Sequence, residues 1–155
     1  MSQILVVDDE PAIRDFVRTF LEDEGYRVAV GRNGNEALRA IRAQHPDLVL
    51  MDIMMPGVDG REVVRLLHEH PAHAAIPVIL MSAAVSWDQV IDGPIQFLRK
   101  PFDLDHLLAM IRTALLRRSA APDPASGFPA PPTSVAAPTP DSGWNSSGYA
   151  SVSFT

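Results

Sequence analysis

The stretch "ILVVDDEP", residues 4–11, decides the fold class. Four apolar residues, Ile4–Val7, run directly into Asp8, Asp9 and Glu10. A short, continuous apolar run is typical of a β-strand that is covered on both faces. Two carboxylates ~4 Å apart repel each other by about 4 kcal/mol at an effective dielectric constant of about 20. An acidic cluster at the end of a buried strand therefore requires water or a bound cation to offset that repulsion.

The same alternation of apolar strand and amphipathic helix continues along the chain. Short apolar runs predict further strands at Val28–Val30, Leu48–Met51, Val78–Met81 and Phe97–Leu98. Helical spacing of apolar residues predicts helices around Ile13–Leu21, Ala37–Ile41, Val63–Leu67 and Leu104–Leu115. Asn33-Gly34 is expected to form a turn, and Asp103 to cap the last helix. Alternating strands and helices imply parallel strands joined by right-handed crossovers, so we predict an open, doubly wound α/β sheet.

Ligands of such sheets bind at the carboxyl ends of the strands. The predicted strands end at Asp8 and Asp9, at Asp52, at Ser82 and at Lys100. Carboxylate oxygens are hard ligands that suit Mg²⁺, which can coordinate phosphate oxygens at the same time. A carboxylate in the cluster is a potential nucleophile toward phosphorus, and a lysine, a hydroxyl and a cation stabilise a transferring phosphoryl group.

Each of these residues also has a simpler interpretation. Asp8 or Asp9 is a possible helix N-cap, and Asp52 a possible turn residue. Lys100 is the only lysine among thirteen basic residues, and its position at a strand end is a possible coincidence. An ammonium group acts as a compact point charge, whereas a guanidinium favours a planar, bidentate partner. We favour a functional site because polar or charged residues of this kind are found together at the ends of four predicted strands.

Four stretches together resemble the receiver domain of bacterial two-component response regulators. They are "ILVVDDEP", "DLVLMDIMMPGVDG", "VILMSA" and "FLRKPF". The resemblance covers residues 1–118. It implies a flavodoxin-like receiver fold with five parallel strands in the order 2-1-3-4-5 and helices around them.

The resemblance also implies a role for each carboxylate. Asp52 would be the phosphoacceptor, receiving a phosphoryl group from a histidine kinase or a phosphotransfer protein. Asp9 and Asp52 would bind Mg²⁺ through their side chains, and Met54 would do so through its backbone carbonyl. Asp8 would act on the metal mainly through water. The chain would catalyse only its own phosphorylation and dephosphorylation, and we do not expect it to be an enzyme on other substrates.

The remaining roles concern the phosphoryl group and the switch. By the resemblance, Ser82 would bind a phosphoryl oxygen and shift toward Asp52, and Lys100 would pair with the phosphoryl group. Phe97 matches the switch aromatic, although it is also a plausible core residue. The bond from Lys100 to Pro101 would be cis, a state that is uncommon even before proline.

The chain departs from the family in the segment before the fifth strand. Seventeen residues separate Ser82 from Lys100, which is about four fewer than is typical and equals roughly one helical turn. We therefore expect a short or irregular fourth helix. The face that includes this helix carries output and dimerisation in the family, so we expect a monomer or a weak dimer.

Residues 119–155 differ in composition from the rest. They are rich in Pro, Ser and Ala and contain no Lys or Arg, which predicts a disordered tail. Alternatively, "GYASVSFT", residues 148–155, would add a strand to the sheet of a partner. The tail has no basic, periodic segment and the net charge is -6, so we expect no direct DNA binding and a downstream protein target instead.

Other classes of protein find less support. There is no cysteine, no apolar run of the ~20 residues that span a bilayer and no signal-peptide pattern, so we expect no membrane association and a cytoplasmic protein. Zinc binding by His68, His70 and His73 is disfavoured, because their spacing is wrong for one helix face and Pro71 interrupts it. A phosphatase would carry an acid at position 54, where the chain has Met54. A binding module with an idle site is the third hypothesis.

Overall fold

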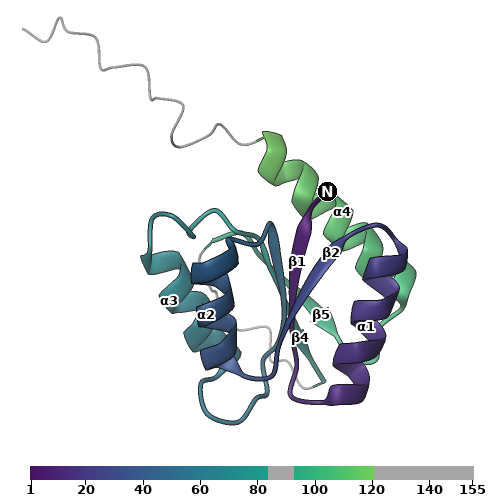
Figure 1. Cartoon of the computed structure of the whole chain (residues 1–155), viewed down its shortest axis with the longest axis horizontal. Coiled ribbons are helices and arrows are strands. Elements are labelled where there is room, and N and C mark those ends of the chain that lie inside the picture. The colour runs from purple at the N-terminus through teal and green to yellow at the C-terminus, as the bar shows by residue number, and fades with distance from the viewer. Residues whose placement is uncertain (84–92, 121–155) are drawn as a thin grey trace, which may run out of the picture. The chain divides into compact units, whose positions relative to one another are not determined.

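The sheet has the predicted topology. A computed structural model describes residues 1–83 and 93–120 of the chain (Figure 1). Five parallel strands lie in the order β2-β1-β3-β4-β5, which confirms the doubly wound α/β prediction. The strands are β1 (Gln3–Val7), β2 (Arg27–Gly31), β3 (Leu48–Asp52), β4 (Val78–Ser82) and β5 (Ile95–Arg99). The helices among the described residues are α1 (Pro11–Asp23), α2 (Gly34–Gln44), α3 (Gly60–Glu69) and α4 (Leu104–Ala120).

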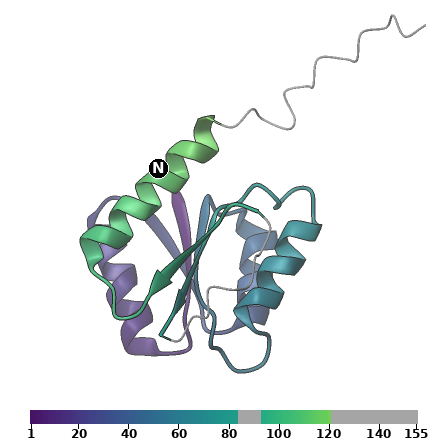
Figure 2. The ribbon, with the colours of Figure 1, turned by 180° about the vertical axis from the view of Figure 1, so that it is seen from behind.

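Helices cover both faces of the sheet. Figure 1 shows α2 and α3 on one face and α1 and α4 on the other, and Figure 2 shows the same layers from behind. Successive strand residues point to opposite layers, so Leu5 packs beneath α2 and α3 while Ile4 and Val6 pack beneath α1 and α4. All five residues of β3 are buried, which explains why this central strand reads as a continuous apolar run.

The register of the strands places their carboxyl ends side by side. Val7 of β1 lies opposite Met51 of β3, and Asp52 lies opposite Met81 of β4. Ser82 in turn lies opposite Arg99, the residue before Lys100. The polar residues that follow or end the four strands therefore meet at one edge, which we call the carboxyl edge.

Local hydrogen bonds explain where the helices begin. Helix α1 starts at Pro11, and its N-cap is Glu10, which makes no side-chain capping bond. Neither Asp8 nor Asp9 is thus the N-cap. The side chain of Asn33 accepts a hydrogen bond from the backbone N–H of Glu36 at 2.9 Å, so the expected turn is the capped start of α2.

The start of α4 and the opposite edge of the sheet are also fixed by polar contacts. Asp103 accepts a hydrogen bond from the backbone N–H of Asp105 at 2.9 Å, which confirms the predicted cap. At the amino edge, where the strands begin, Asp47 accepts from the backbone N–H of Gln3 at 2.8 Å and pairs with Arg118 at 3.4 Å. Arg118 also donates to the carbonyl oxygen of Pro46 at 3.1 Å. The end of α4 is thereby tied to the start of β3.

Two predictions fall outside the described residues. The short fourth helix would lie within residues 84–92, and the disordered tail or its alternative strand within residues 121–155, so both stay predictions. In the parts of the chain that the structure describes, no helix has the length and apolar character needed to cross a membrane.

Candidate functional site

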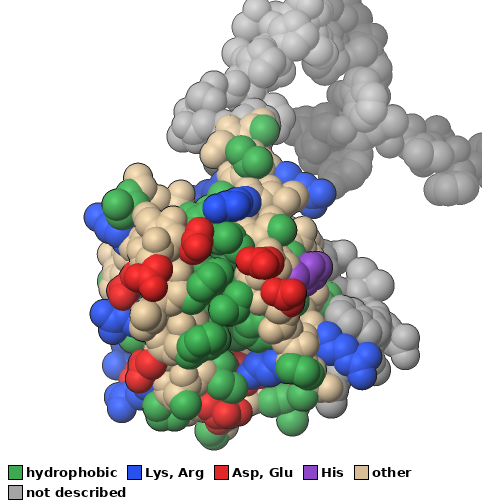
Figure 3. Space-filling model, turned by 90° about the vertical axis from the view of Figure 1, so that its right-hand side faces the viewer, with side chains coloured by type: hydrophobic (Ala, Val, Ile, Leu, Met, Phe, Trp, Pro, Cys, Tyr) green, Lys and Arg blue, Asp and Glu red, His purple; other side chains and the backbone are tan. Residues whose placement is uncertain are grey.

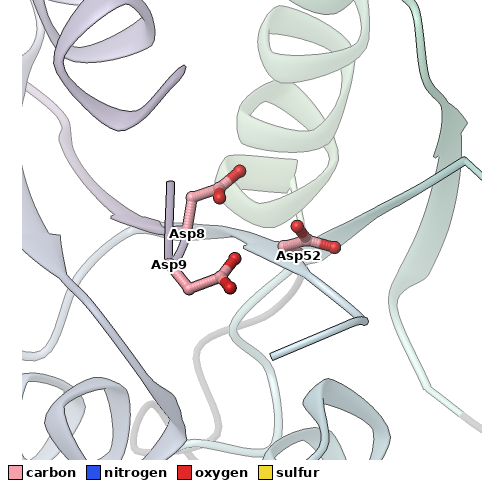
Figure 4. A group of neighbouring side chains, drawn as sticks. All are labelled: Asp8, Asp9 and Asp52. Atoms are coloured by element: carbon pink, nitrogen blue, oxygen red, sulfur yellow. The ribbon is translucent and has the colours of Figure 1, made fainter. Parts of the chain in front are cut away.

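Three carboxylates gather at the carboxyl edge of the sheet. Asp8 and Asp9 follow β1, and Asp52 is the last residue of β3. Each offers one oxygen, and these oxygens lie within 4.8 Å of one another. Figure 4 shows the side chains of Asp8 and Asp9 directed to the side on which Asp52 lies. Asp8 and Asp52 are buried, at 0% and 5% exposure, whereas Asp9 is exposed, so the cluster opens to solvent beside Asp9.

Lys100 joins the two buried carboxylates. Its Nζ atom lies 2.9 Å from Oδ2 of Asp52 and 3.2 Å from Oδ2 of Asp8. The residue is held in place by its backbone N–H, which donates to the carbonyl oxygen of Ser82 at 2.9 Å. A single ammonium group therefore neutralises part of the negative charge that the strand ends concentrate there.

Burial and pairing compete in setting the charges of this group. Burial alone would lower the pKa of Lys100, but its hydrogen bond to Asp52 and the charges of Asp8 and Asp52 outweigh burial and raise that pKa. Lys100 thus stays an ammonium ion. The pKa of Asp8 is raised by burial, and the backbone N–H of Glu10 and the charge of Lys100 offset only part of this effect.

Backbone N–H groups orient both buried carboxylates in the same way. Oδ1 of Asp52 accepts a hydrogen bond from the N–H of Met54 at 3.0 Å. Oδ1 of Asp8 accepts one from the N–H of Glu10 at 2.9 Å. In each carboxylate, one oxygen thus accepts a hydrogen bond from the backbone N–H two residues later, and the other oxygen accepts one from Lys100. The side chain of Met54 is 69% exposed and takes no part in these contacts.

The chain after β3 returns closely to the strand end. A Cβ atom at Gly60, the first residue of α3, would lie 2.8 Å from the carbonyl oxygen of Asp52 and 3.0 Å from Cα of Ile53. Such distances leave no room for a side chain. Asp59 caps the helix by accepting from the N–H of Arg61 at 2.8 Å. The start of α3 is therefore packed directly against the end of β3.

The residues predicted to form the switch lie on β4 and β5, the strands that follow β3 in the sheet. Ser82 is 1% exposed at the end of β4, and its backbone holds Lys100. Phe97 is half-buried in β5 and packs against the apolar cluster beneath α2 and α3. That packing is what a core aromatic would show, and its switch role stays a prediction. The Lys100–Pro101 bond is cis, as the resemblance implies.

The donor set fits a divalent cation with hard-oxygen preference. Three carboxylates whose oxygens lie within 4.8 Å of one another match the ligand chemistry of Mg²⁺. The exposed side, next to Asp9, leaves room for the waters that Mg²⁺ retains. Direct binding by Asp9, Asp52 and the carbonyl oxygen of Met54, with Asp8 acting through water, is what the resemblance implies and stays a prediction.

Sequence reasoning missed one contact of the site. Arg14 of α1 donates from Nη1 to the carbonyl oxygen of Asp8 at 3.1 Å, which anchors the chain between β1 and the helix. Arg14 lies one helical turn beyond the start of α1, on the side of the helix that faces Asp8. The position of an arginine in the first turns of this helix was the only available signal, and it does not distinguish Arg14 from Arg18.

The strand order and the lysine-bridged carboxylates at the carboxyl edge define a flavodoxin-like α/β protein with one acidic site. The particular family follows from comparison with known proteins. The model of the response regulator receiver domain matches residues 4–112, and the chain belongs to this family. The resemblance drawn from the sequence is thereby confirmed.

Curated relatives agree with this assignment. The chain is 39% identical over 128 residues to the response regulator Rre1 of Synechocystis sp., which covers 79% of this chain and 55% of the relative. It is 36% identical over 125 residues to the DNA-binding response regulator MtrA of Mycolicibacterium smegmatis, covering 78% and 54%. The chain thus spans about half the length of these relatives. The expectation of no DNA binding finds no support in them.

Solved structures of receiver domains match over nearly their whole length. The receiver domain of a signal transduction histidine kinase from Syntrophus aciditrophicus is 29% identical with a TM-score of 0.71, covering 79% of this chain and 96% of that one. The chemotaxis response regulator CheY4 of Vibrio cholerae is 27% identical with a TM-score of 0.68, covering 74% and 98%. The described fold is therefore the receiver fold.

Proposed function

We propose that this chain is a phosphorylated signalling switch, with Asp52 as the phosphoacceptor and a sensor histidine kinase or a phosphotransfer protein as the donor. One observation carries the proposal: Lys100 lies 2.9 Å from Asp52 and 3.2 Å from Asp8, in a carboxylate cluster that offers oxygens for a cation. Membership of the receiver family supports it. The output passes through a protein partner, and a cytoplasmic location belongs to the same proposal.

The transfer step follows from the geometry of Asp52. The P–N bond of the donor phosphohistidine breaks, its electron pair stays on the imidazole nitrogen, and a P–O bond forms to a carboxylate oxygen of Asp52. Mg²⁺, when bound, neutralises negative charge on the phosphoryl oxygens. Asp9, Asp52 and the carbonyl oxygen of Met54 would hold it.

Both oxygens of Asp52 are already engaged, one by the N–H of Met54 and the other by Lys100. The Met54 N–H fixes the orientation of the carboxylate. Lys100 must exchange its contact with Asp52 for one with a phosphoryl oxygen as the group arrives. Ser82 at the end of the neighbouring strand would bind a second phosphoryl oxygen, which would pull β4 toward Asp52 and shift a two-state equilibrium.

We further propose that the chain acts on no external substrate. An aspartate-nucleophile phosphatase would carry a general acid two residues after its nucleophile. In this chain that position is Met54, whose side chain is exposed and has no proton to donate. The phosphoryl group therefore stays on Asp52 until water attacks it.

Phosphoryl incorporation tests the proposal. The full chain is incubated with acetyl phosphate or with phosphoramidate, a small donor with a P–N bond, with and without Mg²⁺, and its intact mass is measured. We expect a Mg²⁺-dependent gain of one phosphoryl group that is absent from Asp52→Asn. Asp47→Asn is the matched control, since it changes a carboxylate at the other edge of the sheet. Equal labelling of the wild type and Asp52→Asn, or no labelling by either donor, would contradict the proposal.

A further inference from the structure

A cavity of about 360 Å³ lies at the amino edge of the sheet, away from the carboxylates. It is formed by the loop before β4, by the first residues of β4 and β5, and by the C-terminal half of α4. Figure 2 shows that end of α4 on the same side of the molecule as the starts of β4 and β5. None of its lining residues belongs to the site described above. The cavity is within the size range of small-ligand pockets, which starts at roughly 300 Å³.

The lining of the cavity is mostly apolar and includes one glutamine. Ile79 of β4 and Ala114 of α4 contribute apolar surface on two sides. Gln96 of β5 lies opposite Ile79 and directs its side chain to the α4 face of the sheet, the face to which Leu98 also points. Oε1 of Gln96 is buried and has no hydrogen-bond partner among the residues that the structure describes. A buried amide oxygen of this kind favours a ligand that brings a hydroxyl or N–H donor.

The rim of the cavity is positively charged. Arg117 and Arg118, in the last turn of α4, both line it. Arg118 is partly engaged with Asp47 at 3.4 Å, whereas Arg117 forms no ion pair within residues 1–83 and 93–120. No carboxylate lines the cavity. A carboxylate on a ligand would therefore meet the guanidinium group of Arg117 and, beside it, that of Arg118, which Asp47 already shares.

We propose that this cavity binds a small organic anion with an apolar body, whose carboxylate contacts Arg117 and Arg118 and whose hydroxyl or N–H group donates to Gln96. The apolar lining excludes inorganic phosphate as the preferred ligand, because it would leave the body of the cavity unfilled. Figure 3 views the molecule from the side of α1 and α4 and shows some of its Lys and Arg side chains at the upper end of that face and others spread around its edges. The binding does not depend on phosphorylation of Asp52.

A three-part set of probes tests this assignment. The first probe is 3-(4-hydroxyphenyl)propionate, which carries the carboxylate, the ring and the hydroxyl. The others are 3-phenylpropionate, which lacks the hydroxyl, and 3-(4-hydroxyphenyl)propionamide, which lacks the charge. Each is titrated into the full, ¹⁵N-labelled chain. We expect saturable shifts of the backbone amides of Ile79, Gln96 and Ala114, tightest for the first probe.

Variants separate the site from general charge effects. Arg117→Gln should weaken binding of the first probe by about fivefold, the amount that loss of one partly exposed ion pair represents. Arg112→Gln is the matched control on the same helix, because Arg112 lies outside the cavity and contacts Glu24 at 3.5 Å. Ala75→Trp, at an exposed lining position, should fill the mouth of the cavity and abolish binding.

Three results would overturn the inference. They are the absence of saturable shifts up to the solubility limit of the probe, equal weakening by Arg117→Gln and Arg112→Gln, and shifts confined to the carboxyl edge. Tight binding of the uncharged amide would overturn the anionic part. The experiment measures binding to the unphosphorylated chain. A negative result would therefore not affect the phosphoacceptor proposal, and a failure of Asp52 to become phosphorylated would not affect the proposal of a ligand in the cavity.

Discussion

The two edges of the same sheet treat charge in opposite ways. At the carboxyl edge, three carboxylates crowd together with one lysine between two of them. At the amino edge, Asp47 accepts from the N–H of Gln3 and pairs with Arg118, so its negative charge is matched locally. The amino edge is arranged for stability. The carboxyl edge keeps a surplus of negative charge, which is compatible with the binding of a cation such as the proposed Mg²⁺.

Among the changes that compare the two edges, removal of Lys100 should have the largest effect on the unfolding free energy. Lys100→Met leaves Asp8 and Asp52 buried without their cation, and breaking a buried pair costs about 3 kcal/mol of unfolding free energy. Urea unfolding without Mg²⁺ measures this loss, and added Mg²⁺ should recover part of it. The matched change at the amino edge, Arg118→Met, removes a partly exposed pair and should cost no more than about 1 kcal/mol. Equal losses in the two variants would remove the distinction between the edges.

Removal of one carboxylate at each edge should change stability in opposite directions. Without Mg²⁺, Asp9→Ala relieves repulsion within the cluster and should raise the unfolding free energy by about 0.5–1 kcal/mol. Asp47→Ala leaves the N–H of Gln3 without its acceptor and should lower that free energy by about 1 kcal/mol.

Magnesium sharpens this second comparison. Saturating Mg²⁺ should stabilise the wild type and Asp47→Ala alike, since a cation held by the proposed site would bind only the folded state. Asp9→Ala should lose that gain. The difference between the urea midpoints with and without Mg²⁺ measures this stabilisation by the cation. A stabilisation by Mg²⁺ that is unchanged in Asp9→Ala would show that Asp9 is not a ligand.

The smallest effect concerns a histidine near the amino edge. His73 is buried, and burial, followed by the charges of His70, His45 and Arg42, lowers its pKa from the usual 6.5. The unfolded chain therefore binds a proton more readily than the folded one, and stability falls as the pH drops from about 6.5 through the folded pKa. His73→Gln should reduce this loss by no more than about 1 kcal/mol.

Unfolding at several pH values between about 7.5 and 5 measures the effect. His106→Gln, on the exposed side of α4, is the control. The stability contribution of neutral His73 is present above the pKa of the unfolded chain and is lost as the pH falls through the pKa of the folded chain. The unfolding free energies of His73→Gln and His106→Gln should therefore diverge only at the lower pH values. The same slope in His73→Gln as in the wild type would contradict the expectation.

Much of the fold was predictable because β1, β3 and β4 are covered on both faces. Their continuous apolar runs, each followed by a polar residue, located the strand ends that make the site. The segment around Asn33 was less clear, because an Asn-Gly pair favours a turn as much as a helix start. The structure resolves this through the bond from the N–H of Glu36 to the side chain of Asn33.

Contacts between residues far apart in the chain could not be predicted from the sequence. The spacing of His68, His70 and His73 argued against zinc, but nothing in it showed that His45, from the end of α2, would lie with its ring centroid 5.2 Å from that of His73. The cavity at the amino edge is built from three segments that are far apart in the chain. The complete burial of Asp8 also depends on the packing of neighbouring elements, which local patterns do not record.

The two bonds of Arg118 have a mechanical consequence. Tension applied to the chain at Ala120 would travel along α4 and reach Arg118 two residues earlier. From there it would pass through Pro46 and Asp47 into β3, the middle strand of the sheet, which has a neighbour on each side. A pull on this end of the described chain would thus act first on the hydrogen bond to Pro46 and the ion pair with Asp47, which lead into an internal strand and not into the edge strand β5.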